Sequence, residues 1–180
     1  MIRLILVVAL LAAPVATMAQ HGTGSIEARI ERVEAELAIS NILINYAGFF
    51  NSRDYDGCVS LFAPDGEYTN TDGGYKGQVE IRQMLENIAG PAAAPNGLYY
   101  QIVSNPRIEI DGVNATATSR YLLMVRGPDA MPMPAMAGGY RDEFVQLKGQ
   151  WKILRRIAED LIMPPPEEWR KIVAAPKVTK

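Results

Sequence analysis

The sequence predicts an α+β domain in which a curved antiparallel sheet wraps around three helices. One observation is the recurrence of apolar residues at helical spacing over residues 26–50, with two shorter helical segments behind them. Another is a series of four long strand-like segments between residues 99 and 161. Gly, Pro and Asp lie between the segments, where turns are needed. We find no internal repeat and no second domain.

The first 24 residues resemble a leader rather than part of the fold. Arg3 precedes an apolar run over residues 4–13, and Thr17-Met18-Ala19 supplies the small residues that a signal peptidase recognises. The run is too short for a permanent membrane span. We therefore expect a signal peptide over residues 1–19, export to the periplasm or out of the cell, and a flexible lead over residues 20–24. An uncleaved amphiphilic anchor is the alternative.

The first helix is expected to begin after Ser25, whose hydroxyl can cap it. Its start carries apolar residues on one side and charges on the other, whereas its end is apolar nearly all round. We expect a solvated start and a buried end.

Two further helices are predicted over residues 55–62 and 78–87. Asp54 is placed to cap the first of them, and Gly90-Pro91 ends the second. Ala63-Pro64-Asp65-Gly66 predicts a turn between them, because proline presets the bend and glycine allows a positive φ.

A short hairpin and four long strands make up the predicted sheet. The hairpin joins residues 67–71 to residues 75–76 through Asp72-Gly73-Gly74. The long strands are expected over residues 99–110, 115–126, 140–147 and 151–161.

Two segments fall outside these elements. Residues 127–139 hold three methionines among prolines, which indicates either a long hairpin connection or an apolar flap over a pocket mouth. Copper binding is not expected there, since no histidine or cysteine accompanies the methionines. The domain is expected to span residues 25–163, and residues 164–180, which open with three prolines, to form an extended tail.

Composition excludes several function classes. A formal net charge of -2 argues against nucleic acid and anionic membrane as partners, because both reward clustered Lys and Arg. His21 is the only histidine and lies beside the expected cleavage site, so Ser-His and Cys-His mechanisms and most metal sites are not expected. The single cysteine, Cys58, is expected to be a buried structural thiol. We expect neither a cofactor nor a metal.

Several segments carry a family resemblance in their order and spacing. They are Ala38-Ile39 to Tyr46, Asn51-Ser52-Arg53-Asp54-Tyr55-Asp56, Leu61-Phe62-Ala63-Pro64-Asp65-Gly66, Tyr75-Lys76-Gly77, Val103-Ser104-Asn105-Pro106-Arg107-Ile108, Gly139-Tyr140-Arg141-Asp142, and Trp151-Lys152-Ile153 with Arg156. Together they resemble the SnoaL-like branch of the nuclear transport factor 2-like superfamily, over residues 27–161. The resemblance implies a cone-shaped sheet with an apolar cavity opening at one end. Members include polyketide cyclases, scytalone dehydratase and a hexachlorocyclohexane dehydrochlorinase.

In the dehydratase and dehydrochlorinase members, the resemblance implies an aspartate-histidine dyad that abstracts a proton. The matching positions here hold Asn51 and Gln101. Neither amide is a base near neutral pH, so dyad chemistry is not expected. Two interpretations stay open: the amides meet in the cavity and hold a ligand carbonyl or hydroxyl, or both satisfy buried backbone groups.

Strand alternation suggests further site residues. If Trp151 and Ile153 face inward, Arg155 shares their face and Arg156 does not. Arg155 could then form a buried pair with Asp142, contact an anion, or form an ion pair at the rim. The expected ligand-binding residues are Tyr46, Asn51, Tyr68, Gln101, Tyr121, Tyr140, Asp142 and Arg155, the tyrosines being core residues in the alternative interpretation.

We expect an exported protein that binds a small, mostly apolar molecule in the cone cavity. One alternative is a lyase, dehydratase or isomerase without metal, in which a tyrosine or Asp142 acts as acid or base. A further alternative is an interaction module that forms a homodimer through the outer face of its sheet.

Overall fold

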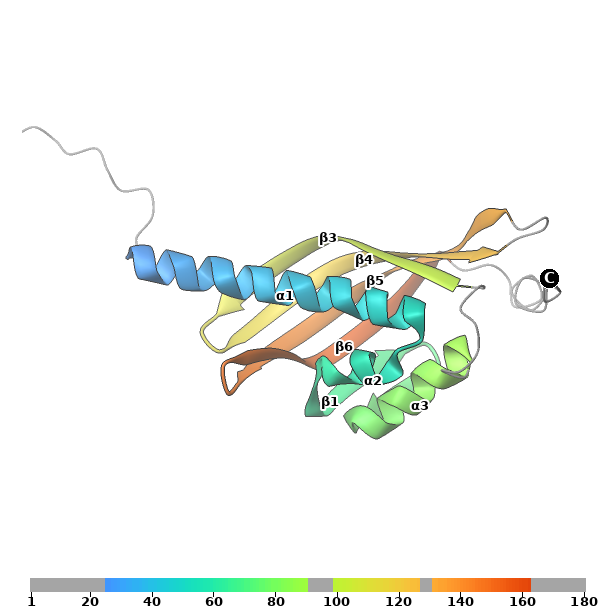
Figure 1. Ribbon diagram of the computed structural model, residues 1–180, viewed down its shortest axis with the longest axis horizontal. Coiled ribbons are helices and arrows are strands. Elements are labelled where there is room, and N and C mark those ends of the chain that lie inside the picture. Colours follow the sequence, from blue (N-terminus) through green and yellow to red (C-terminus); the bar gives the residue numbers. More distant parts are fainter. Residues whose placement is uncertain (1–24, 91–98, 127–130, 163–180) are drawn as a thin grey trace, which may run out of the picture.

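The computed structural model describes residues 25–90, 99–126 and 131–162, and these residues form three helices and a six-stranded sheet (Figure 1). The helices are α1 (Ile26–Ser52), α2 (Tyr55–Ser60) and α3 (Gly77–Ala89). The strands are β1 (Phe62–Asn70), β2 (Gly73–Lys76), β3 (Tyr99–Asp111), β4 (Asn114–Arg126), β5 (Pro132–Leu147) and β6 (Gln150–Ile162). The α+β class is confirmed.

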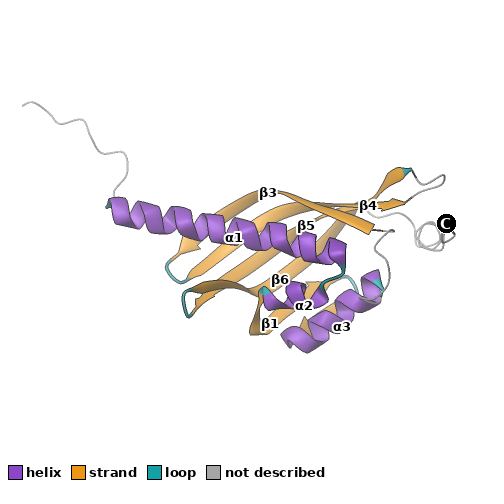
Figure 2. Ribbon diagram, in the orientation of Figure 1, coloured by secondary structure: helices purple, strands orange, loops and turns teal. Residues whose placement is uncertain are grey.

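The strands form one curved, unclosed sheet in the order β2-β1-β6-β5-β4-β3. All neighbours are antiparallel except β1 and β6, which are parallel. Figure 2 shows the helices gathered on one side of the sheet, with α1 running along β3 and α3 lying near β1. The core fills the space between, where Leu43, Leu85 and Ile153 are almost fully buried. Burying each such side chain stabilises the fold by roughly 1.5–3 kcal/mol.

Both predicted helix caps are confirmed. The Ala28 amide donates to Ser25 Oγ over 3.2 Å at the start of α1. The Gly57 amide donates to Asp54 Oδ1 over 2.8 Å at the start of α2. Between them, Arg53 adopts a left-handed conformation (φ 57°), so the chain turns sharply from α1 into α2.

The predicted turn at residues 63–66 is wrong, because this segment belongs to β1. The second helix ends at Ser60, and Phe62 already pairs with Ile153 of β6. The register shifts between Phe62 and Glu67, so the Pro-Asp-Gly sequence bends the strand instead of ending it. Gly66 fits this irregular stretch because the carbonyl oxygens of Ala63 and Ile153 would lie 3.0 and 3.1 Å from any Cβ there.

The fifth strand begins earlier than predicted. Residues 132–139, expected in a connection, pair with β4 as part of β5. Prolines in this segment cannot donate backbone hydrogen bonds, and the register shifts where Met124 meets Pro134. Residues 127–130 lie outside the described part, as do the leader with His21, residues 91–98, and the tail after residue 162; the predictions for them stay predictions. No helix in the described ranges is long and apolar enough to span a membrane.

Candidate functional site

A cavity of about 520 Å³ lies between the helices and the inner face of the sheet. Its polar wall consists chiefly of tyrosines and amides, and its apolar wall of aliphatic and aromatic side chains. The polar residues include Tyr46, Tyr68, Asn70, Thr71, Asp72, Tyr75, Asn87, Gln101, Tyr121 and Tyr140, and the apolar ones Phe50, Met84, Leu85, Ile88, Leu123, Met136 and Ala158. The volume falls within the range usual for small-molecule sites.

Three buried tyrosines share hydrogen bonds in this wall. The Tyr68 hydroxyl interacts with those of Tyr46 and Tyr140. Gln101 Nε2 donates to the Tyr140 hydroxyl over 2.6 Å. The Tyr121 ring stacks at a tilt on Tyr140, with 4.9 Å between the ring centroids. These contacts fix one polar surface inside an otherwise apolar space.

The tyrosine hydroxyls stay protonated. Burial raises the pKa of Tyr46 and Tyr140 well above the usual value of 10.0. Burial likewise raises the pKa of Tyr68 to about 12. A low-dielectric site disfavours the phenolate, so each tyrosine can donate a hydrogen bond but none is a base near neutral pH.

Gln101 presents a free polar atom in the wall. The residue is only 7% exposed, and its side-chain oxygen Oε1 has no hydrogen-bond partner among the described residues. A buried amide oxygen without a partner costs free energy, about 1–3 kcal/mol when it is fully desolvated. A ligand hydroxyl or N–H could recover that energy.

Arg156 lies behind the tyrosines. It donates from Nε to Asp142 Oδ1 over 2.7 Å and from Nη2 to Oδ2 over 2.9 Å. Its guanidinium carbon is 4.2 Å from the ring centroids of both Tyr46 and Tyr140. Burial opposes the charged form, but the Asp142 carboxylate outweighs it and raises the pKa of Arg156. The arginine is a permanent cation that holds two of the cavity's tyrosines in place.

The predicted inward orientation of Arg155 is wrong, and the reason is a β-bulge. In β6, Ile153 pairs with Phe144 and Arg155 pairs with Glu143, so Leu154 is an extra residue without a partner on β5. The bulge reverses the alternation that Trp151 and Ile153 begin. Arg156 therefore points inward.

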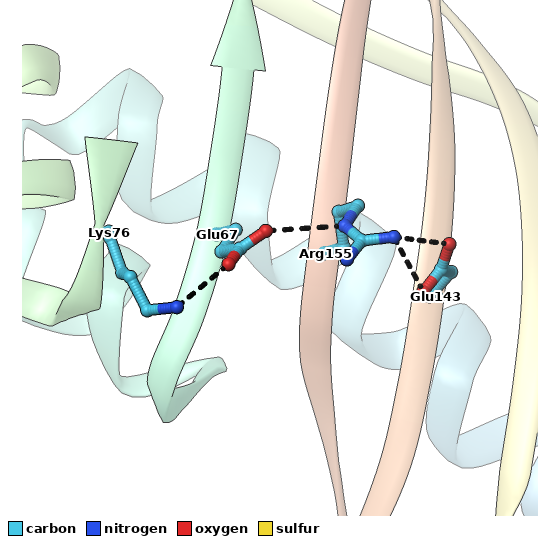
Figure 3. A network of polar contacts seen from close by, with 4 residues as sticks. All are labelled: Glu67, Lys76, Glu143 and Arg155. Atoms are coloured by element: carbon cyan, nitrogen blue, oxygen red, sulfur yellow. Dashed lines mark hydrogen bonds and ion pairs between the residues drawn. The ribbon is translucent and has the colours of Figure 1, made fainter. Parts of the chain in front are cut away.

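Arg155 lies on the outer face of the sheet instead (Figure 3). Its Nε is 3.3 Å from Glu67 Oε2, and its Nη1 is 3.1 Å from Glu143 Oε1. Lys76 binds the other oxygen of Glu67 over 3.0 Å. Arg155 therefore forms exposed ion pairs with Glu67 and Glu143, and Asp142, its expected partner, pairs with Arg156 instead. No local signal in the sequence marks the bulge, since only pairing with the neighbouring strands defines it.

Asn51 and Gln101 meet, but not amide to amide. Asn51 Oδ1 accepts from the Gln101 backbone N–H over 2.7 Å, and Asn51 Nδ2 donates to the Gln101 carbonyl over 2.9 Å. Because β3 is an edge strand, its backbone groups need such a partner. Asn51 thus satisfies a backbone, while the Gln101 side chain lines the cavity.

Asp142 and Cys58 are buried outside the cavity wall. Asp142 shares the inner face with Tyr140 and Phe144, but its carboxylate is bound by Arg156. Cys58 is fully buried, as predicted, and burial raises its pKa to about 12. Among the described residues no group of three or more His, Cys, Asp or Glu side chains is placed to hold a metal ion.

Comparison with known proteins agrees with the fold. Residues 31–157 match the SnoaL-like domain. The uncharacterized protein Rv2910c of Mycobacterium tuberculosis is 27% identical over 134 residues, which are 71% of this chain and 86% of that protein. Two solved structures share the fold. An NTF2-like protein with a cystatin-like fold from Novosphingobium aromaticivorans has 18% identity and a TM-score of 0.67, over 78% of this chain and 92% of that one. The hexachlorocyclohexane dehydrochlorinase LinA-type3 from Novosphingobium barchaimii has 18% identity and a TM-score of 0.65, over 76% and 93%.

Proposed function

Because the chain belongs to the SnoaL-like domain family, we propose that its cavity binds a small, mostly apolar molecule that carries a hydroxyl group. The amide oxygen Oε1 of Gln101, which has no hydrogen-bond partner among the described residues of a tyrosine-lined cavity, is the observation that supports this most directly. A hydroxyl suits that atom because it can donate to Gln101 while accepting from a neighbouring tyrosine. The apolar wall then encloses the rest of the ligand.

Binding is favoured over proton abstraction because the described lining residues include no buried base. The raised pKa values of the three tyrosines leave them as donors. The buried carboxylate of Asp142 is held by Arg156. Asp72 is the one carboxylate among the described lining residues, and it is exposed in the turn between β1 and β2. A general base needs both reach and a suitable pKa, and none of these groups offers both.

A matched pair of probes tests the hydroxyl. We expect 2-naphthol to bind the wild-type chain roughly tenfold more tightly than 2-methylnaphthalene, since one added hydrogen bond contributes about 1 kcal/mol or more. Replacing Gln101 by methionine keeps the side chain's length but removes the amide. In Gln101→Met the two probes should bind with similar affinity. Protein-observed NMR titration measures both dissociation constants.

The neighbouring residue gives the control. Tyr100 precedes Gln101 on β3 but is 59% exposed, so Tyr100→Phe should leave both affinities unchanged. Equal affinity of the two probes for the wild type, or an equal loss for both in Gln101→Met, would refute hydroxyl recognition by Gln101. If neither probe shifts the NMR resonances of residues in the cavity wall, the cavity is refuted as a binding site.

We also propose that the protein acts after export, on the basis of its leader-like N-terminal sequence. Sequencing the N-terminus of the chain recovered from cells tests this. The expected mature chain begins at Gln20; recovery of an intact Met1 in the membrane fraction would indicate the uncleaved anchor instead.

A further inference from the structure

An unpartnered apolar stripe runs along α1. Ile26, Ile30, Val33, Leu37 and Ile44 are each between 53% and 65% exposed. They follow one another at spacings of four and three residues, with Ser40 in the position between Leu37 and Ile44. The stripe spans 19 residues of helix, or about 28 Å at 1.5 Å per residue. Contiguous exposed apolar surface of this kind marks an interaction site.

The stripe has the heptad geometry of a two-helix contact. Alternating steps of three and four residues place side chains on one seam, and a facing helix can receive them as knobs in holes. The other side of α1 faces its own chain: Ile39 and Leu43 are buried in the core. Nearer the start of the helix, Ala28, Ala35 and Ala38, with Glu34 at the edge, line an open cleft toward the turns that join the long strands. Figure 1 shows the first turns of α1 extending beyond the strands.

Charges beside the seam identify the partner and its direction. In a parallel pair of identical helices, Arg29 of each copy lies next to Glu34 of the other, which gives two ion pairs across the seam. Both side chains are exposed, and neither forms an ion pair within the described part of the chain. An antiparallel pair centred on the same stripe would bring Glu34 against its own copy. The stripe can therefore pack against the same stripe of a second copy of this chain, with Arg29 of each copy paired to Glu34 of the other.

We propose that α1 forms a parallel two-helix contact with α1 of a second copy of this chain. This surface differs from the outer face of the sheet, where Lys76, Glu67, Arg155 and Glu143 satisfy one another within a single chain (Figure 3). The acidic residues around the stripe, which outnumber the basic ones, disfavour an anionic membrane as the occupant.

Sedimentation equilibrium of the full chain tests the contact. We expect a dimer whose dissociation constant rises at least roughly tenfold in Leu37→Glu, because the change places two carboxylates in the middle of the seam. Val79 on α3 is 81% exposed and lies away from the stripe, so Val79→Glu is the matched control and should dimerise like the wild type. Circular dichroism verifies that both variants fold.

A charge exchange and a crosslink test the direction. Arg29→Glu and Glu34→Arg should each weaken the dimer, and the double variant should restore it. Val33 faces its own copy in the parallel pair, so Val33→Cys should form an intermolecular disulfide under mild oxidation.

A monomeric wild type or a dimer that Leu37→Glu leaves intact would overturn the proposal. So would a Val33→Cys variant that does not crosslink with itself but does crosslink with a Leu37→Cys variant, because that result indicates an antiparallel pair. A monomer that Leu37→Glu destabilises would show that the chain's own residues cover the stripe. Pelleting with vesicles that Leu37→Glu abolishes, in a chain that stays monomeric, would show a membrane surface instead.

Discussion

Asp142→Asn is expected to destabilise the fold by about 3–5 kcal/mol, because it leaves a buried guanidinium without its counter-charge. The side chains of Asp142 and Arg156 are 0% and 1% exposed. Two hydrogen bonds of 2.7 and 2.9 Å join them, so asparagine, which has one acceptor oxygen, can replace only part of the contact. The variant is isosteric, so the loss reports charge and hydrogen bonding rather than a cavity.

The adjacent pair provides a matched control. Glu143 follows Asp142 on β5 and binds Arg155, which precedes Arg156 on β6. Their side chains are 48% and 45% exposed, so solvent screens the interaction and Glu143→Gln should cost about 0–1 kcal/mol. Urea unfolding followed by tryptophan fluorescence gives both free energies, provided that the m-value stays constant.

A double replacement separates an unpaired charge from lost packing. Asp142→Leu with Arg156→Met removes both charges and should recover most of the stability that Asp142→Asn loses, since apolar residues of similar size often replace a buried pair without cost. A loss below about 1 kcal/mol for Asp142→Asn, or equal losses for Asp142→Asn and Glu143→Gln, would refute the assignment of Arg156 as a buried, permanently charged residue.

Four further predictions concern two buried groups and two glycines. Burial raises the pKa of Cys58 to about 12, so a thiol reagent at about pH 8 should modify the chain only after unfolding; rapid modification of the native chain would contradict this. Burial raises the pKa of Tyr68 from its usual 10.0 to about 12, so its contribution to stability is complete below about pH 10 and is lost as the pH rises toward 12; a constant urea midpoint across that range would be the contrary result. A Cβ on Gly138 would collide with the Tyr121 ring and the Glu159 carbonyl, so Gly138→Ala should cost about 1–3 kcal/mol and displace Tyr121 from the cavity wall. Gly48→Ala on α1 meets nothing within 4 Å and should instead stabilise the helix, by up to about 1 kcal/mol in the same urea assay.

The cavity site was predictable where it depends on residue type and element. The tyrosines at positions 46, 68, 121 and 140 were expected to face a cavity, and all of them lie in its wall. Two interpretations were open for Asn51 and Gln101, a shared site in the cavity or bonds to buried backbone groups; Asn51 binds the Gln101 backbone, and only Gln101 lines the cavity. Which of the two amides binds backbone and which faces the cavity was open, because an amide side chain can bind a backbone or a ligand equally well. Only the position of the β3 edge decides between the two roles.

The orientation of β6 was not predictable, because a β-bulge is a property of paired strands. Leu154 is the bulge residue of β6 and has no partner on β5. The residues around it in the sequence do not identify it as a bulge. One unpaired residue exchanges the two faces of everything after it. That exchange moves Arg155 outward to Glu143 and brings Arg156 inward to Asp142.

The sequence by itself determined the family, the order of helices and strands, and the two helix caps. These follow from local spacing and residue identity, which act within a few residues of the chain. Tertiary structure alone decided which arginine stands behind the tyrosines, which atom of Gln101 is left free, and which apolar side of α1 is left exposed. Each of these depends on contacts between residues far apart in sequence. The register of β5 and β6 decides the orientation of Arg156, and the position of β3 at the sheet edge decides what Asn51 and Gln101 bind. Helix α1 is apolar on two sides, and the single sheet covers only one of them.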